Sequence, residues 1–143
     1  MLPRKARVAM WYYKDNVRNY PGIHMTADAM ACQWISARLT DKALNIVEMM
    51  DLIPPSTAIL AVPNNWLNTA RHVGFTRARF TIDETQQQPV RIVNEFPHIK
   101  INVNAAGRDA LLQGIRDIEA GKGDYCIGED GSELWFWWFP AKL

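Results

Sequence analysis

The sequence feature that most constrains the fold is a β-hairpin signal near the C-terminus. The dipeptide Asp130-Gly131 separates two short apolar runs, residues 124–128 and 133–139, and Asp-Gly is a preferred sequence for a two-residue hairpin turn. Counting outward from this turn fixes a register, with the pairs Ile127–Leu134, Cys126–Trp135, Tyr125–Phe136 and Asp124–Trp137. The chain is therefore expected to end in an antiparallel ribbon whose two faces can be assigned.

The two faces of this ribbon differ in chemistry. One face is apolar and is expected to join the core; it carries Tyr125, Ile127, Leu134, Phe136 and Trp138. The opposite face combines acids with indoles, and it carries Asp124, Glu133, Trp135 and Trp137. Aromatic rings with polar groups around them are typical of surfaces that bind a protein partner, so these four residues are candidate partner-binding residues. The alternative is that a helix covers this face and that both tryptophans belong to the core.

Two helices are predicted. The clearer one spans residues 106–120, because Leu111, Ile115 and Ile118 recur at i, i+4 and i+7 and Gly121 supplies a C-terminal stop. We expect this helix to pack on the apolar face of the hairpin. The other helix is expected to begin after Thr26 as N-cap and to end near residue 39.

Shorter segments rich in β-branched and aromatic residues are expected to be strands, namely residues 7–13, 23–25, 58–62, 77–82, 89–94 and 99–103. The last three follow one another closely, which predicts an antiparallel meander or a bent pair of strands. Residues 64–73 are expected to form one or two helical turns. Residues 43–50 fit a helix and a strand equally well.

The length of the chain bounds its organisation. At 143 residues, with only 16 glycines and prolines, the chain predicts a single globular domain over residues 1–143 without a long linker. The predicted elements indicate an α+β fold with a mixed or mostly antiparallel β-sheet of roughly five to seven strands and two main helices packed on one face.

Charge gives little indication of nucleic acid or of an anionic membrane, since the net charge is +1. One local basic patch stands out, in which Arg71, Arg77 and Arg79 alternate with Phe75 and Phe80. Such a mixture is the local chemistry of a platform for single-stranded nucleic acid. The segment fits no RNP1 pattern, so a solvated basic strand face is favoured and nucleic-acid binding is not expected.

Motifs for catalysis, metals and cofactors are missing from the sequence. The three histidines, His24, His72 and His98, are not at metal-ligand spacing, and Cys32 and Cys126 form no C-x-x-C. His24 and His98 are expected to point away from the apolar side of their strands, as satisfied or exposed groups. No nucleophile elbow, phosphate loop or dinucleotide fingerprint occurs. We therefore predict no catalytic residue, no metal, no cofactor and no disulfide.

Targeting signals are also missing, because no run of about 18 apolar residues occurs and the N-terminal apolar run is too short for a signal peptide. A cytoplasmic protein without a membrane segment is the expectation. The function that the sequence favours is a non-enzymatic protein-binding module that uses the aromatic and acidic hairpin face, with another protein or a second copy, as a homodimer, as partner. The alternative is a small-molecule-binding or enzymatic domain with a pocket between sheet and helices; binding of single-stranded nucleic acid is a third, less favoured function.

Overall fold

A computed structural model describes residues 1–15, 20–63 and 71–141 and shows an α+β fold with two mixed sheets. In chain order, its elements are β1 (Val8–Tyr13), β2 (Ile23–Ala27), α1 (Ala29–Thr40), β3 (Met50–Asp51), α2 (Thr57–Ala61), β4 (His72–Gly74), β5 (Arg77–Ile82), β6 (Val90–Glu95), β7 (His98–Val103), α3 (Ala105–Glu119), β8 (Asp124–Ile127) and β9 (Leu134–Trp137). The α+β class with two main helices, α1 and α3, is confirmed.

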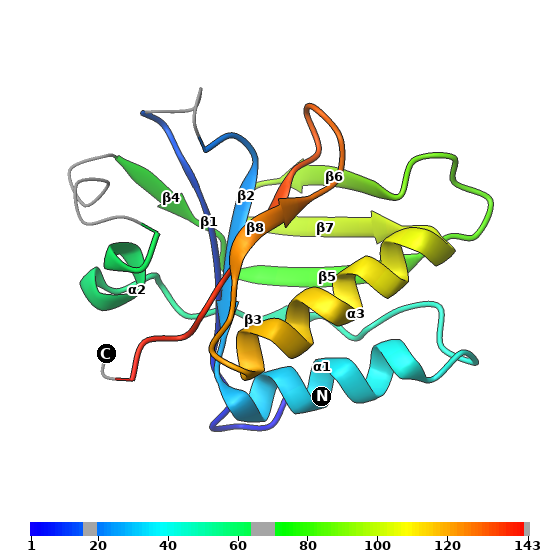
Figure 1. Ribbon diagram of the computed structural model, residues 1–143, viewed down its shortest axis with the longest axis horizontal. Coiled ribbons are helices and arrows are strands. Elements are labelled where there is room, and N and C mark those ends of the chain that lie inside the picture. Colours follow the sequence, from blue (N-terminus) through cyan, green and yellow to red (C-terminus); the bar gives the residue numbers. More distant parts are fainter. Residues whose placement is uncertain (16–19, 64–70, 142–143) are drawn as a thin grey trace.

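The strands form two sheets where the sequence predicted one. Sheet A has the order β4-β1-β2-β9-β8, and sheet B has the order β3-β5-β7-β6. In Figure 1 the strands of sheet A run roughly vertically and those of sheet B roughly horizontally, with α1 and α3 side by side across them. Each sheet contains one parallel pair, β2 with β9 and β5 with β7. Both parallel pairs join strands that are far apart in the sequence or separated by another strand.

The C-terminal hairpin has the predicted register, from Ile127 opposite Leu134 to Asp124 opposite Trp137. Its apolar face packs on α3, as expected. The two elements approach closely at Gly114 in the middle of that helix, where an added Cβ atom would overlap the ring of Phe136. Trp138 does not join this face: β9 ends one residue earlier and the Trp138 side chain is 37% exposed.

The main core lies between the two sheets and the helix pair α1 and α3. A second apolar layer covers the opposite, outer face of sheet A. That layer brings Trp11 and Tyr13 of β1 and Trp137 of β9 against Ile59 and Leu60 of α2. Sheet A is therefore buried on both faces, which the alternation of its strands alone did not indicate.

The first helix begins later than predicted. Thr26 lies in β2, and the N-cap is Asp28, whose carboxylate accepts a hydrogen bond from the backbone N–H of Ala31 at 2.9 Å. A carboxylate caps as well as a hydroxyl does, and pairing of β2 with β1 continues through Ala27. The strand hydrogen bonds thus hold Thr26 in extended backbone.

The prediction of a strand over residues 58–62 is wrong, because residues 57–61 form the helix α2. The reason is local, because Ser56 Oγ accepts from the Ile59 N–H and caps a helical turn, and a short apolar run has no periodicity that separates helix from strand. The helical turns predicted over 64–73 lie largely outside the described residues; residues 72–74 form β4. Within residues 43–50, Ile46 makes a single bridge to Thr81 and Met50 begins β3.

The predicted meander over residues 77–103 is only half right. Strands β6 and β7 form an antiparallel pair, but β5 pairs with β7 in parallel, so that β7 lies between the other two. This order gives sheet B an outer face built from three neighbouring strands.

Candidate functional site

The four candidate partner-binding residues of the hairpin lie in different environments. Asp124 is exposed and Trp135 is half-buried, whereas Trp137 is only 3% exposed and Glu133 only 9% exposed. The Glu133 carboxylate accepts a hydrogen bond from the Gly131 N–H at 2.8 Å, within the turn. Trp137 therefore belongs to the covered layer, as the alternative interpretation had it, and does not present its ring to a partner.

The covered layer on sheet A contains a buried histidine inside a cluster of aromatic rings. The His24 imidazole is fully buried, and its centroid lies 4.8–6.4 Å from five rings, those of Trp11, Tyr13, Tyr20, Trp135 and Trp137. The Nε1–H of Trp137 donates to His24 Nδ1 at 2.9 Å. Because Nδ1 accepts, the imidazole proton lies on Nε2, which faces the Tyr20 carbonyl at 3.3 Å.

Burial lowers the pKa of His24 to about 4, with the Tyr20 carbonyl acting weakly in the opposite direction. A neutral imidazole with both nitrogens satisfied is a packing element at neutral pH. The sequence placed His24 on the side of β2 away from Ile23 and Met25, which is right, but an exposed position is wrong because that side is also covered. His24 is a satisfied core histidine.

The cysteines do not approach a histidine to form a nucleophilic pair. Cys32 lies on α1 in the main core, where its thiol faces the Ala27 carbonyl at 3.5 Å, and burial raises its pKa to about 12. Cys126 lies on β8, opposite Trp135, and burial raises its pKa as well. A raised pKa keeps a thiol protonated and unreactive. Over residues 1–15, 20–63 and 71–141, the side chains of His, Cys, Asp and Glu nowhere gather in threes that could hold a metal ion.

The predicted basic patch is divided between the two sheets. Arg71 forms a bidentate ion pair with Asp15 beside β4, at 2.9 Å, and this pair lowers the pKa of Asp15 to about 2. Arg77 and Arg79 lie on β5 in sheet B. The phenylalanines that suggested base stacking, Phe75 and Phe80, are both buried in the core. These two rings therefore cannot stack on bases, and the hypothesis of a nucleic-acid platform in this segment is wrong.

The outer face of sheet B brings together cationic residues that the sequence analysis did not single out. Along β5 the buried residues Ala78, Phe80 and Ile82 alternate with Arg77, Arg79 and Thr81, so these last three side chains point to the outer side. The register of β7 and β6 extends this face. We call it the basic sheet face, and it consists of Arg77, Arg79, Thr81, Arg91, Val93, Glu95, His98, Lys100 and Asn102. None of these residues is buried.

The pattern that reveals this face is strand alternation in residues 98–103, where buried Ile99, Ile101 and Val103 alternate with polar residues. The alternation of apolar and polar residues is visible in the sequence, but the strand that lies beside each of them is not. The parallel register sets Arg79 directly beside Lys100. Two like charges side by side on one sheet face destabilise the pair, so this juxtaposition costs the fold free energy.

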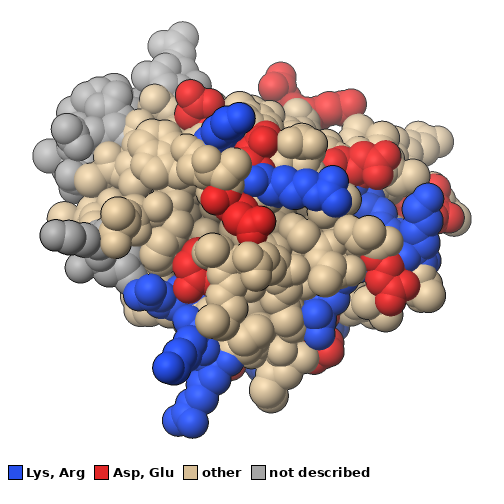
Figure 2. All heavy atoms as spheres, turned by 60° about the horizontal axis from the view of Figure 1, so that its bottom comes forward, with Lys and Arg blue, Asp and Glu red and all other residues tan. Residues whose placement is uncertain are grey.

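Only part of this charge is compensated within the molecule. Arg77 pairs with Asp51 at 3.2 Å, and Lys100 pairs with Glu95 at 2.9 Å. Arg79 and Arg91 form no ion pair with any described residue, and Nε of Arg79 is shielded from solvent without a hydrogen-bond partner among them. Figure 2, in which the bottom of Figure 1 is turned toward the viewer, shows a surface where acidic and basic side chains are intermixed.

Comparison of the chain with known protein families, with curated proteins and with solved structures finds no match. Among the described residues, no helix has both the length and the apolar character needed to cross a bilayer. The basic sheet face is accordingly characterised by its own geometry and charge.

Proposed function

We propose that this protein is a non-enzymatic binding module that docks an acidic protein partner on the basic sheet face. One observation carries the proposal: a sheet face on which no residue is buried sets Arg79 beside Lys100, with Arg91 on the adjoining strand, while Arg79 and Arg91 have no carboxylate partner among the described residues. Carboxylates of a partner would relieve this repulsion.

The two ion pairs already present on and beside this face do not oppose docking. The side chains of Arg77 and Lys100 are 47% and 38% exposed, and those of Asp51 and Glu95 are 89% and 52% exposed. Ion pairs of such exposed groups contribute roughly 0–1 kcal/mol. A partner carboxylate can therefore replace either one at little cost.

An acidic protein is favoured over single-stranded nucleic acid as the occupant. Binding of single strands relies on aromatic rings on which bases stack, and the outward-facing residues of β5, β6 and β7 include no Phe, Tyr or Trp, with the imidazole of His98 as the one ring among them. The proposal therefore assigns the partner interface to sheet B, whereas the sequence analysis assigned it to the hairpin.

The test uses two labelled probes of similar charge in fluorescence anisotropy titrations: a 12-residue peptide of alternating Glu and Ser, and a 6-nucleotide oligothymidylate. We expect saturable binding of the peptide, weakened at least about tenfold by Arg79→Glu with Arg91→Glu, because two attractive charges become repulsive. The matched control is Lys42→Glu with Lys122→Glu, which changes the net charge equally at exposed positions elsewhere.

Three outcomes of the titrations would overturn the proposal. The first is no saturable peptide binding, and the second is an equal loss in both double variants, which would indicate non-specific attraction. The third is tighter binding of the oligonucleotide than of the peptide. Sedimentation velocity of the unmodified protein tests the homodimer: a dimer that Arg79→Glu with Arg91→Glu dissociates would assign the face to a second copy instead of an acidic partner.

A further inference from the structure

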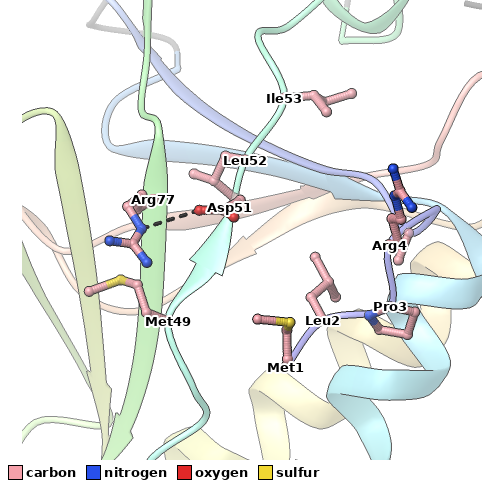
Figure 3. A pocket seen from close by; sticks show the side chains of 10 residues that line it. Met1, Leu2, Pro3, Arg4, Met49, Asp51, Leu52, Ile53 and Arg77 are labelled. Carbon is pink, nitrogen blue, oxygen red and sulfur yellow. Dashed lines mark ion pairs between the residues drawn. The ribbon is translucent and has the colours of Figure 1, made fainter.

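A half-open cleft lies beside the basic sheet face, between the N-terminal segment and β3 (Figure 3). Its volume is about 460 Å³, within the range of roughly 300–1,000 Å³ that is usual for ligand pockets. Its lining is mostly apolar and includes Met1, Leu2, Met49, Leu52 and Ile53. The space is sufficient for a large apolar side chain.

The cleft and the basic sheet face share their border. Arg77 and Asp51 line the cleft, and the same two residues form the ion pair at the β3 edge of sheet B. Figure 3 shows Arg77 on the β5 side of the cleft and Arg4 on the opposite side, on the N-terminal segment. Cationic groups thus lie on both sides of the apolar lining, with Arg77 paired to the exposed Asp51 and Arg4 in no ion pair with a described residue. This arrangement is complementary to an apolar group flanked by carboxylates that replace Asp51 at Arg77.

The backbone of β3 favours a peptide over a small molecule. Ile53 donates its N–H to the Val8 carbonyl, on the side of the chain away from β5. In an antiparallel pair, backbone groups two residues apart point the same way, so the N–H and C=O of Asp51 also point away from β5. An extended segment in the cleft can therefore form main-chain hydrogen bonds with an edge strand.

We propose that the acidic partner segment inserts one large apolar side chain into this cleft, with flanking carboxylates placed toward Arg77 and Arg4. This inference rests on the proposed function, because it assigns the anchor of the same partner. The acidic residues supply attraction along the basic sheet face, and the apolar anchor supplies register and the buried centre of the interface.

The experiment compares two peptides, the Glu-Ser 12-mer and the same peptide with Phe at one central Ser. We expect the Phe peptide to bind about tenfold more tightly, as for one partly buried ring. Met49→Gln keeps the length of the side chain but makes the cleft wall polar, and it should remove most of this gain. Leu2→Gln serves as a second cleft variant in case the first does not fold, as judged by circular dichroism.

The matched control replaces an exposed apolar residue outside the cleft and away from sheet B, Met30→Gln on α1, and should keep the gain. Binding of the Glu-Ser peptide without a gain from Phe would overturn the anchor and leave the proposed function standing, whereas no binding of either peptide would remove both. A gain that survives both Met49→Gln and Leu2→Gln would place the ring elsewhere and overturn the inference. Decanoate that binds the protein more tightly than the Phe peptide does would assign the cleft to a small amphipathic ligand instead.

Discussion

The indole Nε1–H of Trp137 donates a hydrogen bond to Nδ1 of His24, and both side chains are excluded from solvent. The two residues are 113 positions apart in the chain, and they meet because β2 and β9 are parallel neighbours in sheet A. This pair fixes the neutral imidazole in one tautomer. It also ties the C-terminal hairpin to the middle of the sheet, with consequences for stability that can be measured.

The first prediction concerns pH. The folded-state pKa of His24 is about 4 and the ordinary value is 6.5, so the unfolded chain binds the proton more tightly. The free energy of unfolding should be highest above about pH 6.5 and should fall by up to about 3 kcal/mol as the pH drops toward 4. Urea unfolding at several pH values measures this slope. His24→Gln should flatten it between pH 6.5 and 4, and an unchanged slope in that variant would contradict the assignment.

The second prediction separates the two hairpin tryptophans. Trp137→Phe removes the donor to His24 and leaves a buried acceptor unpaired, which should cost about 2–4 kcal/mol. Trp135→Phe loses only a partly exposed hydrogen bond to the Pro21 carbonyl and should cost about 1 kcal/mol. The double substitution Trp135→Ser with Trp137→Ser should unfold the protein. A folded monomer by sedimentation and circular dichroism would instead support an interface on this face.

The third prediction concerns Gly114. Glycine to alanine in an unhindered helix stabilises by roughly 0.5–1 kcal/mol, but here the new methyl group would overlap the Phe136 ring. Gly114→Ala should therefore destabilise by about 1–3 kcal/mol. In the background of Phe136→Leu the same substitution should cost less, because the smaller side chain leaves room. Equal costs in the two backgrounds, from a double-mutant cycle in urea, would show that the two residues are not in contact.

The fourth prediction concerns Arg108, whose side chain is only 8% exposed. Its Nε donates to the Leu39 carbonyl at 2.6 Å and its Nη2 to the Asp41 carbonyl at 2.7 Å, so the guanidinium caps the C-terminal end of α1 from α3. Arg108→Met should cost about 2–4 kcal/mol, because it leaves those carbonyls unpaired. Arg116→Met, at an exposed position of α3, should change stability by less than about 0.5 kcal/mol. Equal thermal unfolding midpoints of Arg108→Met and Arg116→Met would contradict the capping role of Arg108.

Local rules were sufficient where short-range geometry decides the structure. A two-residue turn at Asp130-Gly131 leaves one register for the hairpin, and that register is observed. The period of Leu111, Ile115 and Ile118, with Gly121 as the stop, likewise predicted α3. The structure adds its N-cap, Asn104, whose side chain accepts from the Gly107 N–H. The same rules failed at residues 57–61, because an apolar run of five residues carries no period and a serine cap made it helical.

Burial and partnership of strands were decided by tertiary structure. Whether Trp137 and His24 face solvent depends on the layer that covers sheet A, including α2, and no pattern within β2 or β9 encodes that layer. Tertiary structure also creates the basic sheet face. Arg79 and Lys100 become neighbours only because β5 pairs with β7, although β6 lies between these two strands in the sequence. The sequence by itself determined which side chains alternate along each strand; the long-range pairing, set by burying apolar area over the whole fold, determined which of them meet.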